Sequence, residues 1–147
     1  MIVTLDTGIL VRATHKSDGP ARRLVEILFR DPQHTVVLSR FIISEVGKVL
    51  SYPRLYELFK LTPEEVQEHP DFLLAAVELV DPLRGVPVIL ADPKDDTIFY
   101  TALAAGADVL CVRDRDFYAP NVLDYAARHD LAIMDDSRLL ALLESKG

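Results

Sequence analysis

The chain of 147 residues has one cysteine, no tryptophan and no long apolar run. Its single thiol, Cys111, excludes a disulfide framework and lies in an apolar segment, which predicts a buried side chain and a reducing, cytoplasmic setting. No apolar run approaches the ~20 residues that span a bilayer, so we expect no transmembrane helix, and the first residues lack the pattern of a signal peptide. The length suits one domain with its own core, which we expect to extend over residues 1–147.

An excess of positive charge is also missing, because 16 Lys and Arg stand against 23 Asp and Glu, for a net charge of −7. Neutralising phosphates requires Lys and Arg, so this composition argues against tight nonspecific binding of nucleic acid. It does not exclude a nuclease with a small footprint whose acidic residues bind a metal cation. The chain also lacks a glycine-rich phosphate loop and a nucleophile elbow, so neither of these catalytic signatures applies.

Strand-like and helix-like segments alternate along the chain. Repeated alternation predicts a parallel sheet with helices on both faces, a three-layer α/β/α sandwich. We expect strands at residues 2–5, 35–38, 86–90, 108–112 and 131–133. We expect helices near residues 9–11, from Pro20, from Ser39 to just before Pro53, and at 95–105, 121–128 and 136–143. Residues 54–80 are expected to be helical in two pieces, with a break at His69-Pro70-Asp71 and a second helical run from Phe72 to Val80.

Four acidic residues lie where a strand or loop gives way to a helix or turn. Asp6 ends the first predicted strand, Glu45 lies early in the helix after residues 35–38, Asp96 opens a helix, and Asp114 follows the strand at 108–112. Ligands of open α/β sheets bind at the carboxyl ends of the strands, so these carboxylates are expected to meet at one edge. Such a cluster repels itself, and its natural counter-charge is a hard divalent cation such as Mg²⁺ or Mn²⁺.

Each acid also has an ordinary structural interpretation. Asp6 can cap a helix, and either Asp95 or Asp96 can do the same, which leaves the other unexplained. Residues 113–116 can form a solvated turn with alternating charge. Glu45 is harder to explain, because it falls within the apolar arc of its helix, where a glutamate is rarely buried unless it is paired or bound to metal. The interpretation as a site is strong for the set and weak for each member.

The same residues carry a resemblance to the PIN-domain nucleases, particularly to the bacterial toxin branch of the VapC kind. The segments that match are Leu5-Asp6-Thr7, Ser44-Glu45 with Val49-Leu50, Pro93-Lys94-Asp95-Asp96-Thr97, Ala102-Leu103-Ala104-Ala105-Gly106-Ala107-Asp108 and Asp114-Arg115-Asp116-Phe117. The resemblance implies that Asp6, Glu45, Asp96 and Asp114 form a catalytic cluster that binds Mg²⁺ or Mn²⁺, with Asp116 as a fifth metal ligand. It also implies an endoribonuclease that hydrolyses RNA, the toxin of a toxin–antitoxin pair whose partner is an antitoxin protein.

Two departures from the family pattern matter, at Gly8 and at Val112. Many relatives carry Asn where this chain has Gly8, and a small hydroxyl residue where it has Val112. Arg113 stands where glycine is common, and with Arg12 and Arg115 it is a candidate for contacts to phosphate.

Two alternatives stay open at this point. One is a phosphatase or phosphotransfer domain with an aspartyl nucleophile, although Gly8 stands where such enzymes usually have a second Asp. The other is a PIN-like binding module with weakened metal affinity, which Val112 and the acidic net charge favour.

Assembly is suggested by apolar residues between Tyr52 and Val80. This helical region carries more apolar side chains than one face of a sheet needs, and such a surplus often marks a partner surface. We therefore expect a symmetric homodimer or an antitoxin contact here. The side chains concerned are Leu55, Leu58, Phe59, Phe72 and Leu73.

Overall fold

A five-stranded parallel sheet in the order β3-β2-β1-β4-β5 lies at the centre of the computed structural model, which describes residues 1–14 and 17–146. The register places Val3 beside Val36 and Val109, and Leu5 beside Cys111. Because all strands run the same way, their carboxyl ends meet at one edge of the sheet. The strands are β1 (Ile2–Leu5), β2 (Thr35–Leu38), β3 (Glu78–Leu79), β4 (Val109–Cys111) and β5 (Ala132–Met134).

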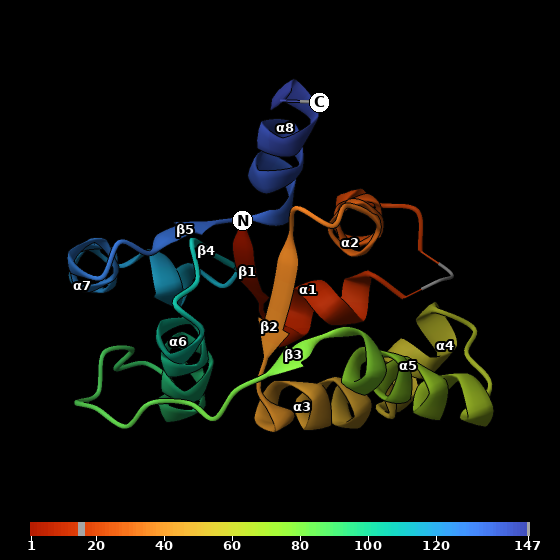
Figure 1. Cartoon of the computed structure of the whole chain (residues 1–147). Coiled ribbons are helices and arrows are strands. Elements are labelled where there is room, and N and C mark those ends of the chain that lie inside the picture. Colours follow the sequence, from red (N-terminus) through yellow and green to blue (C-terminus); the bar gives the residue numbers. More distant parts are fainter. Residues whose placement is uncertain (15–16, 147) are drawn as a thin grey trace.

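Helices cover both faces of this sheet, which confirms the predicted α/β/α sandwich (Figure 1). Helices α6 and α7 lie on one side, α1 and α2 lie on the other, and α8 packs against α2. Helices α3 and α5 pack on each other beyond the carboxyl end of β2 (Figure 1). The helices are α1 (Thr7–Arg12), α2 (Pro20–Arg30), α3 (Arg40–Leu50), α4 (Pro53–Leu58), α5 (Pro63–Ala76), α6 (Pro93–Ala105), the 3₁₀ helix η1 (Arg115–Tyr118), α7 (Pro120–Arg128) and α8 (Asp136–Lys146).

The central strands are mostly apolar because helices bury both of their faces, and the hydroxyl of the buried Thr4 in β1 donates to the carbonyl of Val37. Leu5 of β1 and Leu110 of β4 are fully buried, as is Phe99 of α6, the helix that packs on both strands. Cys111 is buried in this core, as its apolar surroundings in the sequence predict. The core therefore fixes the two strands that deliver Asp6 and Asp114 to the edge.

Local sequence signals set several of the helix boundaries. The hydroxyl of Ser39 accepts a hydrogen bond from the backbone N–H of Ile42 and caps α3, as predicted. Thr62 and Glu65 form a reciprocal capping box at the start of α5. Gly106 ends α6 with φ of +60°, a left-handed conformation that glycine adopts without steric cost.

The predicted break at His69-Pro70-Asp71 is wrong, because α5 continues through Pro70. A proline inside a helix removes one backbone hydrogen bond and costs roughly 3 kcal/mol. Here the ring lies against α3, where a Cβ added to Gly47 would come 3.3 Å from the Pro70 Cγ atom. This close packing of α3 on α5 offsets the loss, and only the tertiary structure contains it.

Two strand assignments also differ from the prediction. Residues 78–79, expected within a helix, form β3, because they pair with Val37 and Leu38 of β2. Residues 86–90, expected as a strand, form part of a long loop. Their backbone groups bond to side chains instead of a neighbouring strand, since Val88 and Ile89 donate to Asp96, and the carbonyl of Val88 accepts from Asn121.

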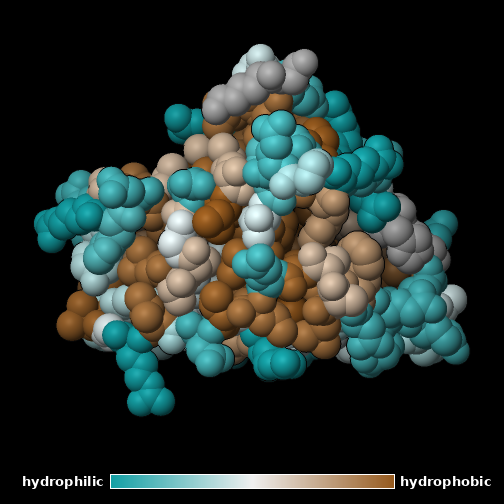
Figure 2. All heavy atoms as spheres, in the orientation of Figure 1, coloured by the Kyte–Doolittle hydropathy of each residue, from teal (hydrophilic) through white to brown (hydrophobic). Residues whose placement is uncertain are grey.

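The surface that we expect to take part in assembly is less apolar than the sequence suggests. Leu73 is fully buried, and Leu55 and Phe59 are half-buried against the core, whereas Leu58 and Phe72 remain exposed at 66% and 52%. Figure 2 shows apolar side chains gathered in the middle of one face, over β2 and β3, with hydrophilic ones around the margin. Within the described residues, no helix combines the length and the apolar character that a membrane crossing would demand.

Candidate metal centre

Asp6 stands at the point where β1 ends and α1 begins. Its carboxylate forms no capping hydrogen bond to the described first turn of α1, so it is not used as a conventional helix cap. The pKa of Asp6 is raised to about 6, chiefly by burial and to a smaller extent by the charge of Asp114, while the nearby backbone N–H groups of Thr7 and Gly8 oppose the rise. The negative charge of this carboxylate is therefore only partly compensated.

Asp95 lies in the first turn of α6, with only 9% of its surface exposed. Its Oδ2 atom is buried and has no hydrogen-bond partner among the described residues. The pKa of Asp95 is raised to about 7, chiefly by burial and further by the negative charges of neighbouring acids, which are Asp114, Asp92, Asp6 and Asp116. Asp95 is therefore the least compensated acid at this edge of the sheet.

Asp114 and Asp116 complete the cluster from the segment after β4. Asp114 caps η1 by accepting a hydrogen bond of 2.9 Å from the backbone N–H of Asp116. One carboxylate oxygen from each of Asp95, Asp114 and Asp116 lies within 4.8 Å of the others. Three oxygens at this spacing, contributed by α6 and by the segment after β4, are suited to surround one cation.

Asp96, the residue predicted as a ligand, has a different environment. Its Oδ1 atom accepts hydrogen bonds of 2.9 Å from the backbone N–H groups of both Val88 and Ile89. The carboxylate thus anchors the loop over residues 80–92 to the start of α6. The helix cap at this point is Asp92, which accepts a hydrogen bond from Lys94. Within the described residues, the aspartate of α6 whose carboxylate lies close to those of Asp114 and Asp116 is Asp95, and the role of Asp96 as a metal ligand stays a prediction.

A signal for Asp95 was present in the sequence. Asp92 followed by Pro93 is a standard cap and first helical residue, which moves the start of α6 ahead of Asp95. With that start, Asp95 shares a helical stripe with the buried residues Ile98, Phe99 and Ala102 at spacings of three, four and seven. An acid at the end of a buried stripe stands out as a candidate for function.

Glu45 lies on α3, which begins at the carboxyl end of β2 and packs against α1. Its side chain is half-buried, as are Phe41 and Val49 one turn before and after it. Among the described residues, the closely spaced carboxylates are those of Asp95, Asp114 and Asp116, without Glu45. Its role as a metal ligand stays a prediction.

Three arginines lie close to the acidic cluster. Arg12, Arg113 and Arg115 line a cavity of about 560 Å³ together with Asp6 and Asp114. Positive and negative groups thus face the same space, an arrangement that can hold a phosphate beside a cation.

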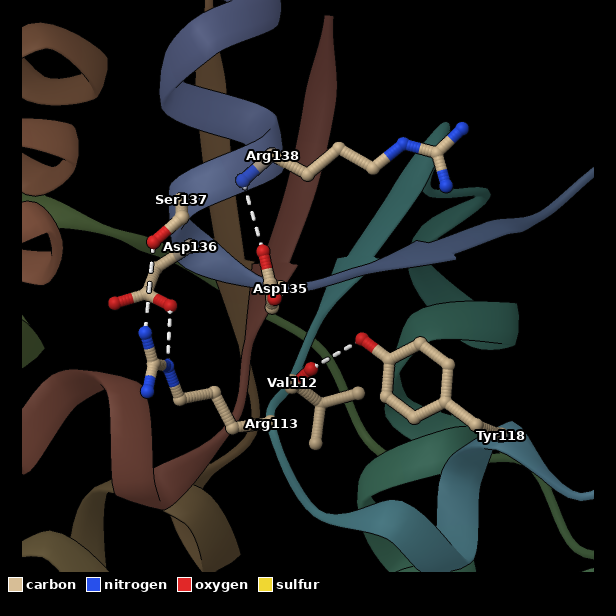
Figure 3. A network of polar contacts seen from close by, with 7 residues as sticks. All are labelled: Val112, Arg113, Tyr118, Asp135, Asp136, Ser137 and Arg138. Atoms are coloured by element: carbon tan, nitrogen blue, oxygen red, sulfur yellow. Dashed lines mark hydrogen bonds and ion pairs between the residues drawn. The ribbon is translucent and has the colours of Figure 1, made fainter.

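Arg113 is fixed in place by an ion pair. Its Nε donates to the buried Asp136 carboxylate over 2.6 Å, and Nη2 lies 3.5 Å from the hydroxyl of Ser137 (Figure 3). This hydrogen bond raises the pKa of Arg113, so the guanidinium remains charged. Figure 3 shows the side chain turned toward the first turn of α8.

The two departures from the family pattern have structural consequences. A Cβ atom at Gly8 would lie 3.6 Å from Oδ2 of Asp6, so the missing side chain leaves space beside this carboxylate. Val112 is fully buried, and its carbonyl accepts a 2.5 Å hydrogen bond from the hydroxyl of Tyr118 (Figure 3). The protein therefore offers no side-chain hydroxyl at position 112.

The residues of the cluster fit a hard divalent cation. Their donors are all carboxylate oxygens, the chemistry that Mg²⁺ and Mn²⁺ prefer. The buried, unpartnered Oδ2 of Asp95 is the observation that tests this fit, because an uncompensated carboxylate is costly to bury. A bound cation would remove that cost and the mutual repulsion of the acids.

Comparisons with known proteins agree with this architecture. The chain is similar to the VapBC2 complex from Rickettsia felis, solved bound to a DNA fragment from its promoter, with a TM-score of 0.57 and 21% identity over 92% of this chain and 98% of the other. At this identity the likeness concerns the fold. No curated protein sequence matches the chain significantly. The family model of the PIN domain matches residues 2–116, which contain β1 to β4 and the whole acidic cluster. The chain belongs to the PIN-domain family.

Proposed function

We propose that this protein is a metal-dependent endoribonuclease and the toxin of a toxin–antitoxin pair. The observation that carries the proposal is Asp95, whose buried carboxylate has an unpartnered oxygen close to the oxygens of Asp114 and Asp116. Membership of the PIN-domain family and the likeness to a VapBC complex add support. The substrate in this proposal is single-stranded RNA.

The proposed ligands are Asp6, Asp95, Asp114 and Asp116, with Glu45 retained as a further candidate. When bound, Mg²⁺ or Mn²⁺ supplies the Lewis acidity that hydrolysis of a phosphodiester requires. The carboxylates hold the cation and accept hydrogen bonds from water at the site. Their contribution is positional as well as electrostatic, because η1 and the first turn of α6 are held by the core.

The three arginines have a separate role in this proposal. Arg12, Arg113 and Arg115 bind and orient the phosphate of the substrate at the mouth of the acidic cluster. The pairing of Arg113 with Asp136 reduces the freedom that its side chain would lose on binding. These three arginines form a local positive group that can bind phosphate although the net charge of the whole chain is −7.

The decisive experiment compares acids inside and outside the cluster. Purified wild-type protein should cleave single-stranded RNA with Mg²⁺ or Mn²⁺ and show no cleavage in excess EDTA. Asp95→Asn and Asp6→Asn should lose cleavage, whereas Asp124→Asn, which alters an exposed acid on α7, should keep it. Full cleavage in EDTA, or equal activity of all three variants, would refute the proposal.

Thermal unfolding supplies a readout that does not depend on the choice of RNA. A cation that binds the folded protein raises its melting temperature by mass action. Mn²⁺ should therefore raise the melting temperature of wild type and Asp124→Asn, and raise that of Asp95→Asn much less. Stabilisation without cleavage of any RNA would favour the binding module over the enzyme.

The proposed partners are an antitoxin protein and a second copy of the chain. Leu58 and Phe72, the exposed members of the predicted surface, are the side chains through which we expect contact. Light scattering should show a dimer for wild type and a smaller mass for Leu58→Asp combined with Phe72→Asp. A monomeric wild type whose mass does not change when the product of a neighbouring antitoxin gene is added would exclude both contacts.

A further inference from the structure

A second cavity adjoins the acidic cluster and contains no acid of that cluster. It has a volume of about 350 Å³, within the range of small-ligand pockets, and shares Arg12 and Arg113 with the cavity that holds Asp6 and Asp114. The remainder of its wall includes Pro20 and Ala21 at the start of α2 and Phe59 at the end of α4. The lining of this second cavity therefore combines two arginines with apolar and aromatic side chains.

We propose that this second cavity binds one nucleoside of a single-stranded RNA, next to the phosphate held over the acidic cluster. The inference rests on the proposed function and adds a base-binding subsite to it. Its base would lie against the ring of Phe59, and its phosphate would pair with Arg12 and Arg113.

Charge complementarity selects this occupant. Asp136 also lines the second cavity, but its carboxylate is paired with Arg113 over 2.6 Å, so the pair does not repel a phosphate as a bare acid would. Arg12 is exposed and adds a second cation at the junction of the two cavities. A strand of RNA alternates phosphates with aromatic bases, which matches arginines beside an apolar, aromatic pocket.

Phe59 is placed to act as a stacking platform. Its side chain is half-buried, so its ring is supported by the core and still reaches the cavity. Stacking of a base on an aromatic side chain strengthens binding roughly 5- to 150-fold, and this gain depends little on which of the four bases is stacked. This subsite therefore predicts a preference for bases over bare backbone, without strong sequence specificity.

The test measures binding without cleavage. The probes are a fluorescein-labelled oligouridylate of about ten nucleotides and an abasic ribose-phosphate chain of equal length, titrated in EDTA with anisotropy as the readout. Wild type should bind the oligouridylate at least about fivefold more tightly than the abasic chain. Phe59→Ala should lose this preference, and Phe59→Tyr should keep it.

Matched variants separate stacking from folding and from charge. Phe72→Ala removes an exposed aromatic that does not line the second cavity, and should keep the preference. Arg12→Ala should weaken both probes alike and reduce the salt dependence of binding by about 0.7 in slope, the value for one phosphate contact in a single strand.

A blocking variant covers the case in which Phe59→Ala does not fold. A Cβ added to Gly19 meets nothing within 4 Å and the residue has φ of −81°, so position 19 accepts a side chain. Gly19→Leu should fill part of the second cavity and abolish the preference, while the smaller Gly19→Ala should keep it.

The outcomes distinguish this subsite from the nuclease itself. Two results would overturn the subsite. One is equal binding of the two probes by wild type, the result expected if the cavity serves a protein partner instead. The other is a preference that is lost in Phe72→Ala but kept in Phe59→Ala and Gly19→Leu. Cleavage with Mn²⁺ together with equal binding would reject the subsite and retain the nuclease. A preference for bases in EDTA without any cleavage in Mn²⁺ would retain the subsite and reject the nuclease.

Discussion

The first turn of α6 presents two neighbouring aspartates to two different surroundings. Asp96 faces the loop over residues 80–92, where two backbone N–H groups satisfy its carboxylate at 2.9 Å. Asp95 faces the carboxyl edge of the sheet, where an oxygen of its carboxylate is buried without a partner among the described residues, beside other acids. The same chemical group therefore serves as a structural anchor at one position and as an unsatisfied acid at the next.

The difference shows how a helix separates structure from function within one turn. Successive residues of a helix point about 100° apart, so Asp95 and Asp96 reach different neighbours although their backbones adjoin. The loop anchored by Asp96 leads directly into the cap at Asp92, which sets where α6 begins. Asp96 thus helps to hold in place the helix that carries Asp95.

Catalysis provides the largest expected contrast between the two residues. Asp95→Asn should reduce metal-dependent cleavage on the order of 100-fold or more, because it weakens the hold on the proposed cation, and losing one source of charge stabilisation in the transition state has costs of this size. Asp96→Asn keeps an oxygen that can accept the two backbone hydrogen bonds and should stay within about tenfold of wild type, at the low end for residues that support a site. Initial rates on one RNA substrate measure both, and a reversed order would invert the assignment.

In the absence of metal, substitution of Asp96 should reduce the stability of the fold more than substitution of Asp95 does, the reverse of their order for cleavage. Asp96→Ala leaves the backbone N–H groups of Val88 and Ile89 without their acceptor, at a cost of about 2–3 kcal/mol. Asp95→Asn should cost nothing in EDTA and is expected to stabilise, since it removes a repelled, buried charge. Urea denaturation of the two variants measures this difference, and a large loss for Asp95→Asn would identify that residue as structural.

The pH dependence of stability should depend on Asp95. Its folded-state pKa is raised to about 7, so the folded protein binds a proton more tightly than the unfolded chain does. This stabilisation is fully present below the unfolded pKa near 4 and is lost as pH rises through 7. Between pH 5 and 8, metal-free wild type should lose on the order of 1–2 kcal/mol more stability than Asp95→Asn. Parallel curves for the two proteins would show that Asp95 titrates normally.

The cap at Asp92 gives the smallest expected effect. Asp92→Ala removes the hydrogen bond to Lys94 and should cost about 1 kcal/mol of stability, as for other helix caps. The stabilisation by Mn²⁺ should be nearly unchanged, because Asp92 is not one of the proposed ligands. A loss of the Mn²⁺ effect comparable to that of Asp95→Asn would extend the metal site to the cap.

Several elements of the fold were predictable because their causes are local. The β-branched run at residues 35–38, the cap at Ser39 and the left-handed stop at Gly106 act through their own neighbours in the chain. The 86–90 loop and β3 were not predictable in this way. An apolar run becomes a strand only if a neighbouring strand offers free backbone groups, and the side chains of Asp96 and Asn121 occupy those of residues 88–89 instead.

The sequence by itself determined the parallel α/β architecture and the placement of Asp6 and Asp114 at one edge, because alternating strands and helices leave all strand ends on the same side. Only the tertiary structure gives Asp95 and Asp96 different surroundings. Local propensities favour an acid at either position near the start of a helix. The difference depends on the path of the adjoining loop, which brings the N–H groups of Val88 and Ile89 to Asp96, and on the segment after β4, which brings Asp114 and Asp116 to Asp95. The loop is itself bonded to Asn121, 33 residues beyond Val88, and Asp114 and Asp116 follow another strand, so these energies are absent from any local segment of the chain.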